Sequence, residues 1–260
     1  MSNAAVERDR QWIWRFRPAP AAPAQLVCFP HAGGSAGYFL PMVRALTPSL
    51  DVLCVQYPGR QDRSGEAPVE DVHELADLVS AELRPWIDHR PLTLFGHSLG
   101  ASVAFEVAVR LEGAGTEVSG LIASGRRAPS RTRPDRVHER DDRALIAELE
   151  RLAGTDTRML RDPDIVRMVL PSLRSDYKAA ETYRCRPGAS RISAPLLVLT
   201  GDADPQVTAD EAADWAAHTS GSCTLSTHPG GHFFLTEHPA EVNREIDAFA
   251  RVRTSQGDPA

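Results

Sequence analysis

Short apolar runs that alternate with amphipathic segments predict an α/β protein, with a mostly parallel sheet flanked by helices. The chain has 260 residues, 42% of them hydrophobic, which suits one domain with a sizeable core. The alternation stops between residues 126 and 190, where only helical patterns occur. We therefore expect a single domain over residues 1–260, with its core at 12–125 and 191–252 and a helical insertion at 126–190.

Five apolar runs bounded by turn residues have the near-continuous hydrophobicity typical of buried parallel strands. A weaker sixth run, CTLS, lies at 223–226, and WIWRF at 12–16 is a candidate edge strand. Helical patterns connect these runs, which implies right-handed crossovers between parallel strands. The five runs lie at 25–29, 52–57, 92–95, 120–124 and 195–200, and the candidate helices lie near 37–47, 71–87, 98–113, 209–218 and 239–252.

The insertion contains two or three helical patterns after a charged, proline-containing start, GRRAPSRTRPDR. In the first pattern, Leu145, Leu149 and Leu152 recur at three- and four-residue spacing and form one apolar stripe. Between the fourth and fifth parallel strands, the insertion would lie at the carboxyl edge of the sheet, where open α/β folds bind ligands. We therefore predict a lid, the alternative being a helical subdomain that only stabilises the fold.

The net charge of −6 argues against a nucleic-acid-binding protein, which would usually carry a basic excess. No run approaches the ~18 apolar residues that span a bilayer, and the charged start of the chain is unlike a secretory leader. We expect a cytoplasmic protein without nucleic-acid or membrane partners. The sequence does not fix the oligomeric state, for which a monomer is the simplest expectation. The sequence has no CxxC pair to indicate a zinc or redox site, and Cys28 and Cys54 are expected in the core.

The pentapeptide GHSLG at 96–100 follows the strand-like run LTLF and opens a helical run. This is the setting of a nucleophile elbow, a strained strand-to-helix turn that exposes a serine. Glycines two positions before and after Ser98 remove side chains that would collide in so tight a turn. The free N–H groups at the start of the helix would also face the site. We therefore predict that Ser98 is a catalytic nucleophile.

A serine nucleophile needs a base, and the base needs a group that orients it. His232 is preferred as the base because it follows the last strand-like run in a glycine-rich loop, HPGGHFF. Asp204 is preferred as the acid over Asp202, because the later aspartate has cleared the strand and Asp202 would bond loop backbone. The order Ser98, Asp204, His232 is that of α/β-hydrolase triads. The lesser candidates for the base are His31, His228 and His238, whereas His97 is expected to be structural and His73, His89, His138 and His218 to lie on helix surfaces or loops.

An acyl-transfer site also needs an oxyanion hole, a pair of N–H donors for the tetrahedral intermediate. The residue after the nucleophile, Leu99, would supply one backbone N–H. The second would come from the glycine-rich turn at 29–39, where Ala32 is preferred and Gly33 is a close competitor. The alternative is that this turn is a plain glycine-rich connection between a strand and a helix.

Together, these motifs resemble the type II thioesterases of polyketide and nonribosomal peptide synthesis. The resemblance runs from about Trp12 to Phe249 and rests on FPHAGGSA, YPGRQDR, LFGHSLGA, SGRRAPSR, LPSLRSDYKAAETY, GDADPQV and GGHFFL. The combination of YPGR with the lid stretch is more specific than the triad, which many esterases share. One departure is Leu99, where the family often has Met. Only its backbone is used, so catalysis should survive.

The resemblance implies an α/β-hydrolase fold and a stand-alone serine hydrolase without a cofactor or metal. Such an enzyme removes acyl groups from the phosphopantetheine arm of acyl or peptidyl carrier proteins and so edits an assembly line. Ser98, Asp204 and His232 would form the triad, with Ala32 and Leu99 as oxyanion donors. One candidate surface for an acidic carrier is an arginine cluster, which could equally be a solvated loop: Arg126, Arg127, Arg131, Arg133 and Arg136.

Three other functions stay open at the level of sequence. The chain could hydrolyse acyl-CoA or small esters, or it could transfer the acyl group to an alcohol or amine. A cyclising domain is normally fused to a synthase, and 260 residues leave no room for a carrier domain. The third, a catalytically silent binding protein, is disfavoured by the intact triad.

Overall fold

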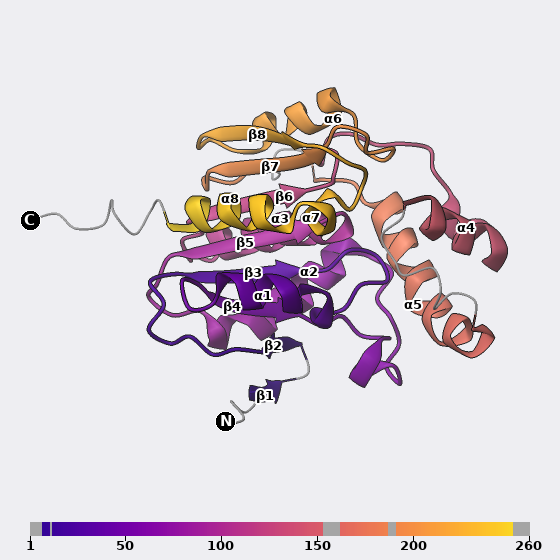
Figure 1. The fold of residues 1–260 in the computed structure, drawn as a ribbon, viewed down its shortest axis with the longest axis horizontal. Coiled ribbons are helices and arrows are strands. Elements are labelled where there is room, and N and C mark those ends of the chain that lie inside the picture. Colours follow the sequence, from indigo (N-terminus) through magenta and orange to yellow (C-terminus); the bar gives the residue numbers. More distant parts are fainter. Residues whose placement is uncertain (1–6, 11, 153–161, 187–190, 252–260) are drawn as a thin grey trace, which may run out of the picture.

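The computed structural model describes residues 7–10, 12–152, 162–186 and 191–251, which form one sheet with helices on both faces (Figure 1). The strand order is β1-β2-β4-β3-β5-β6-β7-β8. Strands β3 to β8 run parallel to one another, whereas β2 pairs antiparallel with β4 and β1 pairs antiparallel with β2. Residues 153–161 and 187–190 of the predicted insertion, and residue 252 of the predicted core, lie outside the described residues. The strands are β1 (Glu7–Arg10), β2 (Ile13–Arg15), β3 (Gln25–Phe29), β4 (Asp51–Val55), β5 (Leu92–His97), β6 (Gly120–Ser124), β7 (Leu196–Gly201) and β8 (Cys223–His228).

The six apolar runs all form strands, which confirms the predicted α/β class. The segment 12–16 contains β2, but the prediction that it forms the edge is wrong, because β1 pairs with its outer side. The sequence of β1, ERDR, has no apolar residue, so hydrophobic periodicity could not reveal it. The helices, at predicted positions except for α7, are α1 (Leu40–Leu46), α2 (Val72–Leu83), α3 (Leu99–Gly113), α4 (Asp142–Leu152), α5 (Pro163–Thr182), α6 (Ala209–Ala213), α7 (Phe234–Glu237) and α8 (Pro239–Arg251). Short 3-10 turns are η1 (Ala36–Phe39), η2 (Gln61–Arg63), η3 (Arg84–Trp86), η4 (Val137–Glu139) and η6 (Asp214–His218).

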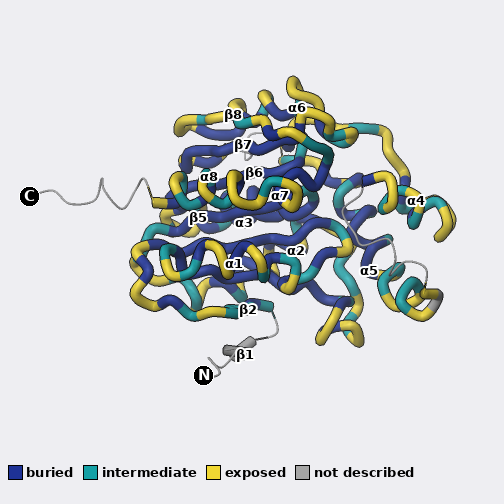
Figure 2. Tube along the Cα trace, in the orientation of Figure 1, coloured by how far each residue is buried: buried dark blue, intermediate teal, exposed yellow. Residues whose placement is uncertain are grey.

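Alternate side chains of the buried strands enter two apolar layers, one on each face of the sheet. On one face, Val27 and Phe29 of β3 pack with residues of α2 and α3. On the other, Leu26 and Cys28 pack with residues of α1 and α8. Cys54 joins this second layer, so the predicted core position of both cysteines is confirmed. Figure 2 shows the central strands of the sheet, β3 to β7, as continuously buried.

The predicted insertion supplies α4 and α5, which lie together beyond one end of the sheet (Figure 1). Its apolar stripe is used for packing, since Leu145 is fully buried against Val137, Leu173 and Tyr177 in a small separate core. Leu152, at the other end of the stripe, joins the apolar layer that contains α1 and α8. These contacts hold the two helices over the edge at which β5, β7 and β8 end.

Candidate active site

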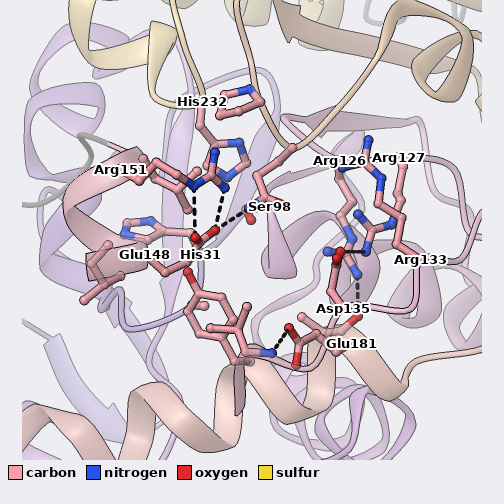
Figure 3. Close-up of a pocket in the computed structure, with 18 of the residues that line it drawn as sticks. His31, Ser98, Arg126, Arg127, Arg133, Asp135, Glu148, Arg151, Glu181 and His232 are labelled. Carbon is pink, nitrogen blue, oxygen red and sulfur yellow. Dashed lines mark hydrogen bonds and ion pairs between the residues drawn. The ribbon is translucent and has the colours of Figure 1, made fainter. Parts of the chain in front are cut away.

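Ser98 occupies the turn between β5 and α3, where the sequence predicts a nucleophile elbow (Figure 3). Its backbone has φ 54° and ψ −119°, a conformation that residues with side chains rarely adopt. A β-carbon at Gly96 would overlap the backbone of Gly100, and one at Gly100 would overlap the carbonyl of Phe29. Both positions therefore require glycine. The Ser98 N–H donates to the carbonyl oxygen of Ser124 at 2.8 Å, which ties the elbow to the end of β6.

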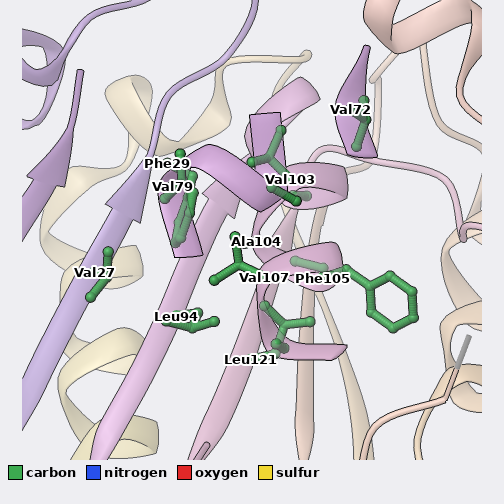
Figure 4. Packing of buried hydrophobic residues seen from close by; sticks show 14 of the residues in the cluster. Val27, Phe29, Val72, Val79, Leu94, Val103, Ala104, Phe105, Val107 and Leu121 are labelled. Carbon is green, nitrogen blue, oxygen red and sulfur yellow. The ribbon is translucent and has the colours of Figure 1, made fainter. Parts of the chain in front are cut away.

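Helix α3 gives the elbow a firm support, because most of its length is buried in one apolar layer. Figure 4 shows Val107 of this helix near Leu94 of β5 and Leu121 of β6, with Val103 farther along the helix in the same apolar layer. Burial of each such side chain contributes about 1.5–3 kcal/mol. The helix that begins at the strained serine thus stabilises the fold by more than the about 1–3 kcal/mol that the strain costs.

His232 and Asp204 come together from the loops that follow β8 and β7. Nδ1 of His232 lies 2.8 Å from Oδ2 of Asp204, and the two side chains are only 2% and 0% exposed. Because a carboxylate only accepts hydrogen bonds, Nδ1 carries the proton and Nε2 is left as an acceptor. The other carboxylate oxygen of Asp204 accepts the Gln206 N–H at 2.8 Å. Asp202 instead accepts the Gly230 N–H at 3.0 Å, the loop-bonding role predicted for it.

Ser98 and His232 line the same cavity, which has a volume of about 210 Å³ and is also lined by Leu149 of α4 and Tyr177 of α5. In the described part of the chain no hydrogen bond joins the Ser98 hydroxyl to the His232 ring. Hydrogen bonds between a nucleophile and its base are often long before the substrate binds. The structure therefore places a serine and a histidine with an acceptor nitrogen on one cavity, with a buried carboxylate bonded to the other nitrogen of the histidine.

Two other histidines lie near this space and are poor bases. His31 lines the cavity and packs edge-on against Tyr38 and Phe233. Burial lowers the pKa of His31 to about 3, and the neighbouring His232 and Arg60 act in the same direction. Burial also lowers the pKa of His97 well below its ordinary value, and Nδ1 of His97 lies 3.0 Å from the Ser124 hydroxyl. Both rings are therefore neutral at physiological pH, and His97 is structural as predicted.

The remaining candidates for the base lie outside the triad. His228 is buried and contacts Glu245 at 3.1 Å, whereas His238 follows α7 and its N–H donates to a backbone carbonyl. The prediction that His218 lies on a surface is wrong, because it is buried and contacts the Ser130 hydroxyl at 2.9 Å. His218 ends η6, and Trp215 of the same turn is buried in the apolar layer that contains α2 and α3. The sequence pattern does not predict this burial.

The two predicted oxyanion donors are compatible with the geometry. Leu99 is the first residue of α3, so its N–H has no partner within the helix. Ala32 lines the cavity with Ser98. The N–H of the competitor, Gly33, is already donated to Oδ2 of Asp176 at 2.7 Å. This contact favours Ala32 over Gly33, and the roles of Ala32 and Leu99 stay predictions.

The arginine cluster offers little free positive charge. Four of its members are paired with carboxylates: Arg127 with Asp135, Arg131 with Asp214, Arg133 with Glu211 and Arg136 with Glu139. Arg126, Arg127 and Arg133 also line the cavity, and burial, aided by the neighbouring Arg127, lowers the pKa of Arg126 to about 9. The contacts therefore do not favour this cluster as a docking surface for an acidic partner.

One feature beside the site has no counterpart among the predicted roles. Arg60 and Asp176 form a buried, bidentate ion pair with N–O distances of 2.7 and 2.8 Å. Burial alone would lower the pKa of Arg60, but the carboxylate of Asp176 raises it above the ordinary value, so the guanidinium stays charged. The two residues are 116 positions apart, and no local pattern predicts such a contact. Arg60 belongs to the motif YPGR and Asp176 to the lid stretch LPSLRSDYKAAETY.

Two classes of site have no candidate in the described ranges. None of the helices there combines the length and apolar character that a bilayer crossing requires. The same ranges contain no group of three or more His, Cys, Asp or Glu side chains placed to hold a metal ion.

Comparison with known proteins gives a consistent family assignment. Residues 24–250 match the thioesterase domain family. The chain is 53% identical to thioesterase PikA5 of Streptomyces venezuelae over 237 residues, which cover 90% of this chain and 84% of that protein. It is 51% identical to a probable cadicidin biosynthesis thioesterase of Streptomyces griseus over 244 residues, 94% of this chain and 67% of that protein. The solved structure of the type II thioesterase BorB from the borrelidin biosynthetic cluster superposes with a TM-score of 0.83 at 49% identity, covering 92% of this chain and 96% of BorB.

Proposed function

We propose that this chain, which belongs to the thioesterase domain family, acts in the cytoplasm as a stand-alone type II thioesterase. It hydrolyses acyl groups held as thioesters on the phosphopantetheine arm of acyl or peptidyl carrier proteins, and so edits a polyketide or nonribosomal peptide assembly line. The observation that carries the proposal is that Ser98 and His232 line one cavity under α4 and α5, while Asp204 is hydrogen-bonded to His232. The similarity to BorB, itself a type II thioesterase, supports the substrate class.

The reaction uses only side chains and backbone groups of this chain. Oγ of Ser98 attacks the thioester carbonyl carbon while Nε2 of His232 takes the hydroxyl proton. Asp204 holds the ring in the required tautomer and stabilises the imidazolium. The N–H groups of Ala32 and Leu99 stabilise the negative charge on the carbonyl oxygen.

Collapse of this intermediate breaks the C–S bond, and the sulfur takes the proton from His232 and leaves as a thiol, which returns His232 to its neutral form. The acyl group is now an ester of Ser98. His232 then deprotonates a water molecule, which attacks the ester carbonyl, and the proton returns to Oγ as the carboxylic acid leaves. Because thiolate is a good leaving group, selection among substrates depends on access and geometry more than on bond strength. We assign that selection to the lid helices, whose Leu149, Leu152 and Tyr177 line the cavity.

The proposal is tested by intact-mass measurement of a panel of acylated carrier proteins after exposure to the enzyme. We expect each accepted carrier to lose the mass of its acyl group, and the variant Ser98→Ala to fold normally without removing any. The same acyl groups on coenzyme A serve as the comparison. Equal or faster turnover of the acyl-CoA series would make the chain a small-thioester hydrolase, and acyl transfer to an added alcohol or amine in place of water would make it a transferase.

A further inference from the structure

The lid helix α5 is hydrogen-bonded to the turn at residues 31–34, which carries the proposed oxyanion donor Ala32. Oδ2 of Asp176 accepts the Gly33 N–H at 2.7 Å and Nη1 of Arg60 at 2.7 Å. Nη1 of Arg60 also donates to the carbonyl oxygen of Gly34 at 3.0 Å. The side chains of Arg60 and Asp176 are only 6% and 1% exposed, so these bonds form away from solvent.

A second contact from α5 reaches the same turn. Gly33 has φ +75°, and a β-carbon there would lie 2.9 Å from Cδ1 of Leu173. Leu173 and Asp176 are three residues apart and share one face of the helix. The turn is therefore packed against α5 by Leu173 and hydrogen-bonded to it by Asp176.

The ion pair needs an explanation beyond stability. A buried salt bridge is weak support for a fold, because the cost of desolvating both charges offsets much of their attraction. Here the pair binds both the N–H of Gly33 and the carbonyl of Gly34, so it fixes the two peptide groups on either side of the one that joins Gly33 to Gly34. Since each peptide unit is planar, fixing the Gly33 N–H also fixes the Ala32 carbonyl in the same unit.

We propose that Asp176 and Arg60 are positioning residues, which hold the 31–34 turn so that the Ala32 N–H is directed at the oxyanion. The inference rests on the proposed function, because it takes the hydrolysis at Ser98 as the reaction. Through these two residues the lid helix is part of the catalytic architecture as well as the cover of the cavity. A positioning role predicts a loss in kcat with little change in KM, because the oxyanion forms only after the substrate has bound.

The test uses the double variant Arg60→Met/Asp176→Leu. Replacing a buried ion pair by apolar side chains of similar size is often neutral or stabilising, so this variant is expected to fold. It removes the hydrogen bond to Gly33 while the apolar contact of Leu173 remains. We expect kcat to fall about 10- to 100-fold with KM changed by less than about 3-fold, the range for a displaced catalytic donor. The variant Asp176→Asn, which keeps an acceptor oxygen for Gly33, should recover part of the loss.

The matched control is Lys178→Met, on the same helix. Lys178 pairs with Glu70 and so ties α5 to the segment before α2 without touching residues 31–34. Its kcat should stay within about 2-fold of that of the unmodified enzyme, since surface ion pairs contribute little. An equal loss in this control would show that any loosening of α5 matters, and would overturn the inference. A double variant that folds and has an unchanged kcat would also overturn the inference. If the double variant does not fold, an unchanged kcat in the variant Arg60→Lys would overturn it.

The assay uses both an acylated carrier protein and a p-nitrophenyl acyl ester. If the unmodified enzyme cleaves the ester but no carrier thioester, the proposed substrate class fails while the positioning test proceeds on the ester. If it cleaves the carrier thioester but the double variant does so equally fast, the positioning role fails and the proposed function stands.

Discussion

Replacement of Asp204 by Asn removes the charge that faces the proposed catalytic base. The carboxylate lies 2.8 Å from Nδ1 of His232, and its side chain is 0% exposed, so solvent does not screen the pair. Two unit charges about 4 Å apart at an effective dielectric constant of about 20 interact by about 4 kcal/mol. That energy corresponds to about 10³-fold in rate, at 1.36 kcal/mol for each factor of ten. An Asn amide can also donate to Nδ1 and favour the wrong tautomer, so we expect kcat to fall by about 10³- to 10⁴-fold.

The assay follows release of the free thiol from an acylated carrier protein under single-turnover conditions, with thermal unfolding to confirm that the variant folds. Asp202→Asn is the matched control, because Asp202 lies two residues away and bonds only loop backbone among its described contacts. Its rate should stay within about 3-fold of that of the unmodified enzyme, as expected for a surface substitution. A rate for Asp204→Asn within 10-fold of the unmodified enzyme, or an equal loss in Asp202→Asn, would refute the assignment of Asp204 as the orienting acid.

Three further predictions concern stability, pH and specificity. Gly100→Ala should lower the free energy of unfolding by more than about 2 kcal/mol in denaturant titration, because its β-carbon would overlap the Phe29 carbonyl; Gly113→Ala, with open space around it, should not destabilise the protein. The pKa of His31 is lowered to about 3 by burial, so the unfolded chain binds a proton near pH 6.5 that the folded chain does not. The contribution of neutral His31 to the free energy of unfolding is therefore fully present above about pH 6.5 and is lost as the pH falls toward 3. Between pH 7 and pH 5 this loss is about 2 kcal/mol. The variant His31→Gln should lack this part of the pH dependence. Leu149→Ala should enlarge the cavity and raise kcat/KM for bulkier acyl groups relative to short ones by about 10-fold in competition assays, and an unchanged preference would argue against the lid as the selector.

The parts of the fold that the sequence predicts are those with a local cause. The sequence predicts buried strands because each is a short apolar run. It predicts the elbow because the crowding at Ser98 comes from positions only two residues away, which are both glycine. Hydrophobic periodicity does not predict β1, because its four residues are all charged, even though its partner β2 is close in the sequence. His218 was misplaced because the burial of η6 depends on its docking to the sheet, which periodicity over five residues does not encode.

In the candidate site, too, some residues can be predicted from the local sequence and others cannot. Ser98, Asp204 and His232 could be chosen because each follows a predicted strand, and parallel strands end at one edge of the sheet. The sequence could not separate Ala32 from Gly33 as the oxyanion donor, since that choice depends on a hydrogen bond from Gly33 to a carboxylate 143 residues away. Side-chain contacts between distant segments carry no periodic or compositional signal, so they become visible only in the structure.

The two roles of α5 suggest how an enzyme of this kind can discriminate among thioesters. Tyr177 and Ala180 line the cavity, whereas Asp176, within one turn of both, holds the 31–34 turn. An acyl group that displaces this part of the helix would disturb the peptide groups beside Ala32 as well. A poorly fitting substrate would then bind without difficulty but meet a misaligned oxyanion hole, and it would react slowly. The C–S bond of every thioester is easily cleaved, so bond strength does not separate one substrate from another. An interaction that forms only in the transition state can separate them, because it changes kcat.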